Sequence, residues 1–127
     1  MDSAHQETQV EHAAEVTVEC TGCKAEDAAA IFTVLRTCFA SDRDADDAPR
    51  ETAGAGPSVW TATFDVNQPR DTPEPTRLSA PCTVTLQGGY QAVDQLRKAL
   101  LPAFVVSVAG TAAGDQEEEV SLRLESR

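Results

Sequence analysis

Hydrophobic and polar residues alternate along four segments of the chain, whereas two other segments repeat their hydrophobic residues at helical spacing. Alternation with a period of two is typical of a strand that buries one face, and a period near 3.6 is typical of an amphipathic helix. The pattern predicts strands over residues 14–20, 59–66, 81–89 and 119–126, and helices over residues 24–40 and 90–104. The order strand–helix–strand therefore occurs twice.

These two similar halves, residues 14–66 and 81–126, predict one α+β domain with the ferredoxin-like order βαββαβ. In such a plait, four strands form an antiparallel sheet and two helices cover one of its faces. We also expect a short extra strand near residues 104–109. Residues 1–13 are polar and show neither pattern, so we expect a flexible segment there, ahead of a single domain over residues 14–127.

The alternation also predicts which side chains lie on the uncovered face of the sheet. This set is polar, rich in threonine and without aromatic residues: Thr17, Glu19, Thr61, Thr63, Asp65, Thr83, Thr85, Gln87, Ser121, Arg123 and Glu125. Plaits that bind RNA stack bases on aromatic side chains of that face. The set therefore argues against RNA recognition.

Charge and composition narrow the partners further. The 127 residues carry a formal net charge of −11, whereas nucleic acids and anionic membranes attract proteins through Lys and Arg. No run of about 18 apolar residues is present, and the polar N-terminus lacks the basic start and apolar run of a signal peptide. We expect a cytoplasmic protein with no nucleic-acid or membrane partner. Acidic residues gather in 41–57 and 110–119, which we interpret as solvated loops.

Four features of the first half occur together: the strand EVTVE, the alanine-rich helix EDAAAIFTVL, a loop rich in arginine and aspartate, and a strand that ends in FDVNQPR. On these features, residues 15–70 resemble an uncharacterised family of small proteins, a domain of unknown function, from Streptomyces and related actinobacteria. The resemblance implies an actinobacterial source. It implies no activity, cofactor or site residue, and the second half of the chain departs from that family.

Cys20 and Cys23 form a CxxC pair between the first strand and the first helix. Heavy-metal-associated domains hold a soft metal ion such as Cu(I) at this place in a plait, and thioredoxin-like proteins begin a helix with a redox CxxC. However, Cys20 continues the inward alternation of Val16 and Val18, and a buried free cysteine acts as a small apolar residue. The favoured interpretation is two structural cysteines, with a metal site at Cys20 and Cys23 or a redox pair as alternatives.

The other two cysteines, Cys38 and Cys82, lie at inward positions of their elements and are expected in the core. In a plait, the strands that carry Cys20 and Cys82 are parallel, which predicts a separation of more than about 10 Å between these residues. Both histidines, His5 and His12, precede the domain, and no GxSxG, HExxH or triad motif is present. We therefore assign no catalytic residue and no cofactor.

Together these patterns favour a non-enzymatic interaction or regulatory module that forms a homodimer or binds a protein partner. One alternative is a small-molecule-binding protein or a cofactor-independent enzyme of the dimeric α/β-barrel type, by analogy of fold alone; a pocket above about 300 Å³ would favour it. The other is a soft-metal or thiol-redox protein that uses Cys20 and Cys23. A metal site there predicts two exposed sulfur atoms within about 4 Å of each other.

Overall fold

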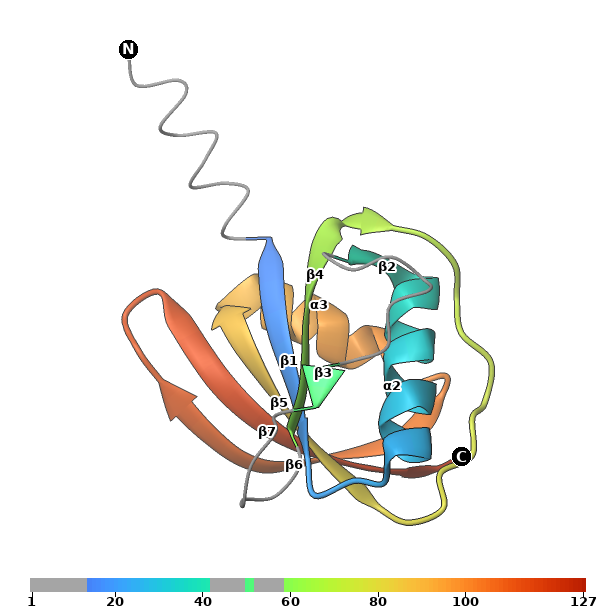
Figure 1. Cartoon of the computed structure of the whole chain (residues 1–127). Coiled ribbons are helices and arrows are strands. Elements are labelled where there is room, and N and C mark those ends of the chain that lie inside the picture. Colours follow the sequence, from blue (N-terminus) through green and yellow to red (C-terminus); the bar gives the residue numbers. More distant parts are fainter. Residues whose placement is uncertain (1–13, 42–49, 52–58) are drawn as a thin grey trace.

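The computed structural model describes residues 14–41, 50–51 and 59–127 (Figure 1). The N-terminal segment 1–13 and most of the acidic segment 41–57, for which we expected a flexible tail and a solvated loop, lie outside these residues. Within the described residues the elements follow in the order β1 (Glu15–Thr21), α2 (Ala25–Cys38), β2 (Phe39–Ser41), β3 (Arg50–Glu51), β4 (Val59–Pro69), β5 (Cys82–Gly89), α3 (Tyr90–Ala99), β6 (Phe104–Ala113) and β7 (Glu117–Ser126).

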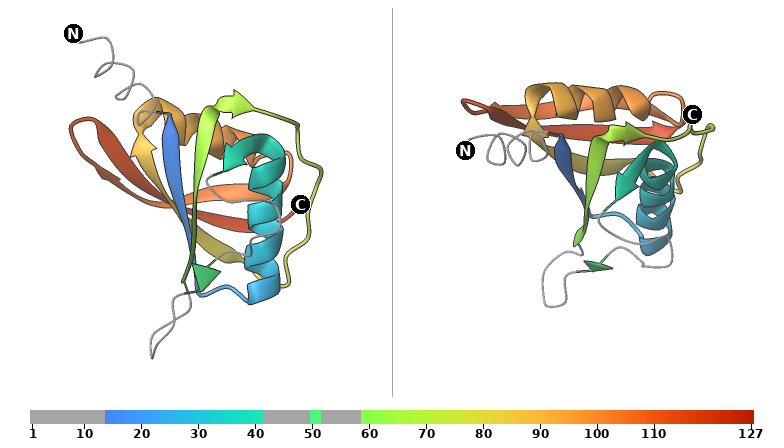
Figure 2. Two further views of the ribbon diagram at one scale, coloured as in Figure 1. Left: turned by 45° about the horizontal axis from the view of Figure 1, so that its top comes forward. Right: turned by 90° about the horizontal axis from the view of Figure 1, so that it is seen from above.

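The strands form one antiparallel sheet in the order β2–β4–β1–β5–β7–β6, and the short strand β3 also pairs with β4. Apart from the short strand β3, the elements of the two halves of the chain follow in the same order, β1–α2–β2–β4 and β5–α3–β6–β7. The halves meet where β1 pairs with β5, with Val18 opposite Leu86. Figure 2 shows the strong twist of the sheet, which makes β6 and β7 cross the direction of β1 and β4.

The predicted ferredoxin-like plait is therefore wrong. It required four strands in the order βαββαβ, but each half contains at least one further strand between its helix and its last strand, namely β2 and β3 in the first half and β6 in the second. The strand directly after each helix, β2 or β6, reverses the chain, so β4 and β7 return antiparallel to β1 and β5 instead of following a right-handed crossover. The helices also lie mainly over different strands, since α2 contacts β4 and β2, whereas α3 contacts β5, β1 and β7 and, to a lesser extent, β4.

Both predicted helices are confirmed, and each ends earlier than expected. Helix α2 stops at Cys38 because Phe39 already has extended backbone dihedrals and begins β2. Helix α3 stops at Ala99, ahead of Pro102, a residue that cannot continue the backbone hydrogen bonding of a helix. Neither helix of the described residues is long and apolar enough to cross a membrane. The extra strand expected near 104–109 is confirmed as β6, which continues to Ala113.

One face of the sheet is buried and the other is open to solvent, as the alternation predicts. Phe64 of β4 and Phe32 of α2 are fully buried, and their rings stack with centroids 6.2 Å apart. Leu86 and Leu122 continue this buried layer across β5 and β7. None of the eleven polar residues predicted for the open face is buried. Transfer of this apolar layer from water is the main favourable term in the folding of such a domain.

An extended connection over residues 70–81 joins the halves and, as Figure 1 shows, runs along the outer side of α2. At its start the amide of Arg70 donates to the carbonyl of Cys38, at 2.8 Å. Further on, the amide of Thr76 donates to the carbonyl of Ala103, in the turn before β6, at 2.9 Å. The connection therefore ties the end of α2 to the second half of the chain.

The pairing of β1 with β5 leaves no room for a side chain at Gly88. A Cβ atom there would lie 2.7 Å from the carbonyl oxygen of Glu15, whereas a Cβ atom at Gly110 would meet nothing within 4 Å. We expect Gly88→Ala to lower the free energy of unfolding by about 1–3 kcal/mol, because backbone must move. The matched variant Gly110→Ala should change it by less than about 1 kcal/mol. Urea unfolding of both variants measures the difference, and equal stabilities would contradict this packing.

Candidate functional site

Three of the four cysteines gather where β1 ends and β5 begins. Cys20 is the last buried residue of β1, with 0% of its surface exposed. Gly22 then turns the chain with a φ of 71°, a left-handed conformation that glycine adopts readily. Cys23 follows, half-buried, just before α2. The Sγ atoms of Cys20 and Cys23 lie 2.8 Å apart.

Cys82, the first residue of β5, completes this cluster. The antiparallel register puts Val84 opposite Cys20, so Cys82 is the diagonal neighbour of Cys20 on the same buried face. Such neighbours lie about 7–8 Å apart. The predicted separation of more than about 10 Å is therefore wrong, because the two strands are antiparallel and not parallel. Cys82 lies near enough to Cys23 for that thiol to raise its pKa.

The surroundings favour the neutral thiol at Cys20 and at Cys82. Burial raises the pKa of Cys20 well above its usual range, and the hydrogen bond with Cys23 adds to this effect. Burial, and to a lesser extent the interaction with Cys23, raises the pKa of Cys82 to about 12. None of the cysteines forms a disulfide. Cys20 and Cys82 therefore carry their protons at neutral pH.

A buried carboxylate lies at the same end of the molecule. Asp27, in the first turn of α2, is 4% exposed. It accepts two hydrogen bonds from Ser79, from the amide at 2.9 Å and from the hydroxyl at 2.6 Å. Burial acts to raise the pKa of Asp27, but the bonds from Ser79 outweigh it and lower the pKa below the usual value of 3.8. Asp27 thus holds the connection 70–81 against the start of α2 as a charged group.

The metal expectation at Cys20 and Cys23 meets one of its two conditions. The sulfur atoms are closer than about 4 Å, but the side chain of Cys20 is fully buried instead of exposed. Across the described ranges, no group of three or more His, Cys, Asp or Glu side chains has an arrangement suited to a metal ion. The metal site remains a prediction.

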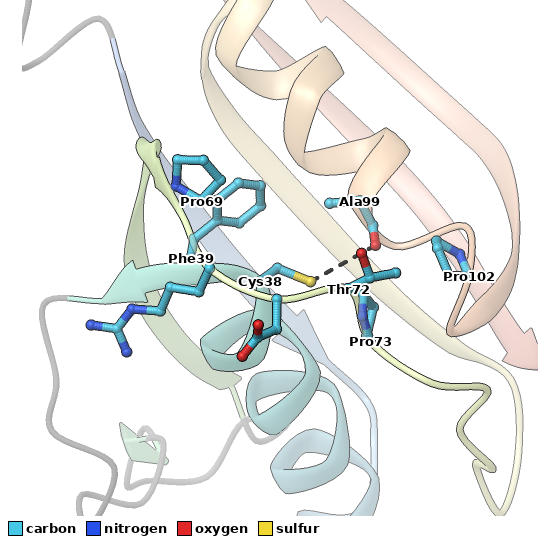
Figure 3. A pocket seen from close by; sticks show the side chains of 9 residues that line it. Cys38, Phe39, Pro69, Thr72, Pro73, Ala99 and Pro102 are labelled. Carbon is cyan, nitrogen blue, oxygen red and sulfur yellow. Dashed lines mark hydrogen bonds between the residues drawn. The ribbon is translucent and has the colours of Figure 1, made fainter.

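The fourth cysteine, Cys38, lies at the opposite end of α2. As expected it is buried, and burial raises its pKa to about 11. Its Sγ donates to the carbonyl of Ala99 at 3.8 Å, which joins the last turns of both helices (Figure 3). A cleft of about 230 Å³ opens beside this contact, lined among others by Phe39, Pro69 and Pro102. It is smaller than the roughly 300–1,000 Å³ of most ligand pockets.

A second candidate feature is the open edge of the sheet at β6. No strand of the described residues pairs with its outer side. Its sequence FVVSVAGTAA has no charged residue and no proline. Val108 is 57% exposed although it lies opposite the buried Leu122, and Val105, opposite Glu125 and so pointing to the other face, is 45% exposed. Figure 1 shows the far end of the β6–β7 hairpin extending beyond the helices.

Sequence reasoning placed Cys82 in the core but missed its neighbours, and it missed Asp27 altogether. Cys20 ends one predicted strand and Cys82 begins another, a combination that brings residues together only when the strands are antiparallel neighbours. The predicted antiparallel sheet already implied such neighbours, and the error was to treat these two strands as parallel. For the bond between Asp27 and Ser79, which lie 52 positions apart, we find no local signal in the sequence.

The charge of Asp27 can be tested through pH. Because its pKa is lower in the folded chain than in the unfolded chain, it stabilises the fold above about pH 4, and this contribution is lost as the pH falls through the folded value. We expect Asp27→Asn to lower the free energy of unfolding by about 1–3 kcal/mol near neutral pH, and by much less near pH 2. The control is Glu26→Gln, the same change on an exposed neighbour. Equal losses for both variants in urea unfolding would contradict the role of Asp27.

Comparisons with protein-family models, with curated proteins and with solved structures found no match to this chain. The resemblance of residues 15–70 to a family from Streptomyces remains a prediction.

Proposed function

We propose that this protein is a non-enzymatic interaction module that forms a homodimer by antiparallel pairing of β6 with β6 of a second copy. The observation behind the proposal is an edge strand of ten residues without a charged side chain. The backbone amides and carbonyls on the outer side of an edge strand can extend the sheet into another chain. A homodimer uses this surface twice, in a closed two-fold arrangement.

The contrast between the two edges supports this choice of surface. Soluble proteins protect edge strands by shortness, charge, proline or bulges. At one edge, β2 has only three residues, and its pairing with β4 is irregular. At the other edge, β6 is long, and the irregularity between Val108 and Gly110 is its one protective feature. Exposed valines on both faces of β6 would add apolar contacts to the paired backbones.

Charge determines the direction of pairing. Each copy has a net charge of −11, which opposes association. The acidic run Glu117–Glu119 lies beside the last residues of β6, with Glu118 opposite Ala113. Antiparallel pairing places the runs of the two copies at opposite ends of the shared strands, about 30 Å apart. This exceeds the Debye length of about 8 Å, whereas parallel pairing would bring the runs together.

Two further parts of the proposal concern location and ligands. We propose a cytoplasmic protein that binds neither nucleic acid nor membranes, which its acidity supports. The alternative of a ligand-binding protein or enzyme has less support. The cleft beside Cys38 is smaller than the expected size, although its lining combines apolar side chains with the polar residues Arg70, Asp71 and Thr72.

A charge placed on β6 tests the proposal. We expect the wild type to elute with twice the mass of the 13.5 kDa chain in size-exclusion chromatography with light scattering. Val108→Lys should shift it to the monomer mass, because two like charges would meet near the two-fold axis, and like charges on neighbouring positions of paired strands are destabilising. The side chain is exposed in the single chain, so the fold should persist.

The control is Thr83→Lys, which adds the same charge to the open face of β5, an inner strand that does not reach the β6 edge. It should remain dimeric. A wild type that stays monomeric at its highest soluble concentration, or a Val108→Lys variant as dimeric as the control, would refute pairing through β6.

A further inference from the structure

The sulfur atoms at the end of β1 are arranged for bond formation. Cys20 and Cys23 face each other with their Sγ atoms 2.8 Å apart, whereas a disulfide bond is about 2.05 Å long. Closing the gap requires a movement of less than about 1 Å. Gly22, whose added Cβ would meet nothing within 4 Å, gives the connecting turn conformational freedom.

We propose that Cys20 and Cys23 are an oxidation site that forms a reversible intramolecular disulfide, and that they react with small disulfide compounds. The two thiols differ in access, and this difference assigns their roles. Cys23 is half-buried and reachable from solvent, whereas Cys20 is fully buried beneath it. Cys23 is therefore the residue that meets the oxidant, and Cys20 is the residue that resolves the intermediate.

The reaction balances in two exchanges. In the first, the sulfur of Cys23 attacks a disulfide RSSR; a Cys23–SR bond forms, the S–S bond of RSSR breaks, and RSH leaves with the proton of Cys23. In the second, the sulfur of Cys20 attacks the sulfur of Cys23; the Cys20–Cys23 bond forms and a second RSH leaves with the proton of Cys20. The chain loses two electrons and two protons, and RSSR is reduced to two RSH.

The surroundings determine the speed and the direction of this chemistry. The thiolate is the attacking species, and burial keeps the Cys20 thiol protonated. The second exchange should therefore be slow near neutral pH and faster in alkaline buffer. The product is uncharged and lies among apolar side chains, so the cost of burying a thiolate does not apply to it.

Cys82 is the competing partner, because it belongs to the same cluster and its thiol interacts electrostatically with Cys23. Trypsin separates the outcomes, since Cys20 and Cys23 share the peptide 1–24, Cys82 lies in 78–97 and Cys38 in 37–43. A bond between Cys20 and Cys23 links the peptide 1–24 to no other peptide and lowers its mass by about 2 Da, because two hydrogen atoms are lost. A bond to Cys82 instead links 1–24 to 78–97.

In the experiment, the full chain is equilibrated with excess glutathione disulfide at about pH 8.5. The reaction is then quenched with acid, the remaining thiols are alkylated, and the tryptic peptides are identified by mass. We expect 1–24 as an internal disulfide, with Cys38 and Cys82 alkylated, and full reversal by glutathione. Cys38→Ser is the matched control and should oxidise like the wild type. Cys23→Ala should keep Cys20 alkylated, since the accessible thiol is gone.

Three results would overturn the proposal. These are a cross-link between 1–24 and 78–97, glutathione retained on Cys23 without resolution, and a peptide 1–24 with both thiols alkylated at equilibrium. Each can be read from the wild type alone, so the test does not depend on whether a cysteine variant folds.

Discussion

Antiparallel pairing between β1 and β5 is the constraint on which the rest of this structure depends. Val18 lies opposite Leu86 at the centre of the sheet, and each half of the chain builds outward from this seam. Because both halves add their strands in the same order, β4 with β2 on one side and β7 with β6 on the other, the seam also fixes which strands become edges. The close approach at Gly88, where β5 leaves no space for a Cβ atom beside β1, shows how tightly the seam is packed.

The same seam creates the thiol cluster. In an antiparallel pair the end of one strand meets the start of the next, so Cys20 and Cys82 become neighbours although 61 residues separate them in the sequence. Cys23 joins them because the glycine turn after β1 folds back over the strand end. Asp27 lies at the same end of the molecule, where it accepts hydrogen bonds from Ser79 in the segment that precedes β5. Strand pairing, helix start and connection therefore meet at one place.

The sequence predicted the local elements and the faces of the sheet, but not the neighbours of each strand. Alternation depends on which side of a strand is buried, and it gave the open polar face from Thr17 to Glu125 correctly. The neighbours of a strand depend on the direction in which the chain returns to the sheet. One added strand after a helix, such as β2 or β6, reverses that direction. β2 escaped notice because Phe39 and Ala40 continue the apolar pattern of α2 and Ser41 begins the predicted loop, and β6 was underestimated because alanine, glycine and threonine in its second half give no alternation. The error about Cys20 and Cys82 had a different cause, since two neighbouring strands of an antiparallel sheet were treated as parallel.

The two halves share one order of elements but differ in what their outer strands can do. β2 is short and irregular, whereas β6 presents ten uncharged residues with exposed valines. The proposed association therefore concerns the second half of the chain, and the proposed thiol chemistry concerns the seam. Two strand spacings of about 4.8 Å separate β5 from β6, and the sulfur atoms lie on the buried face while strand pairing uses the edge. Because the two features share no side chain and no backbone group, the state of the thiols and the state of association should vary independently, which lets each be attributed to its own part of the fold.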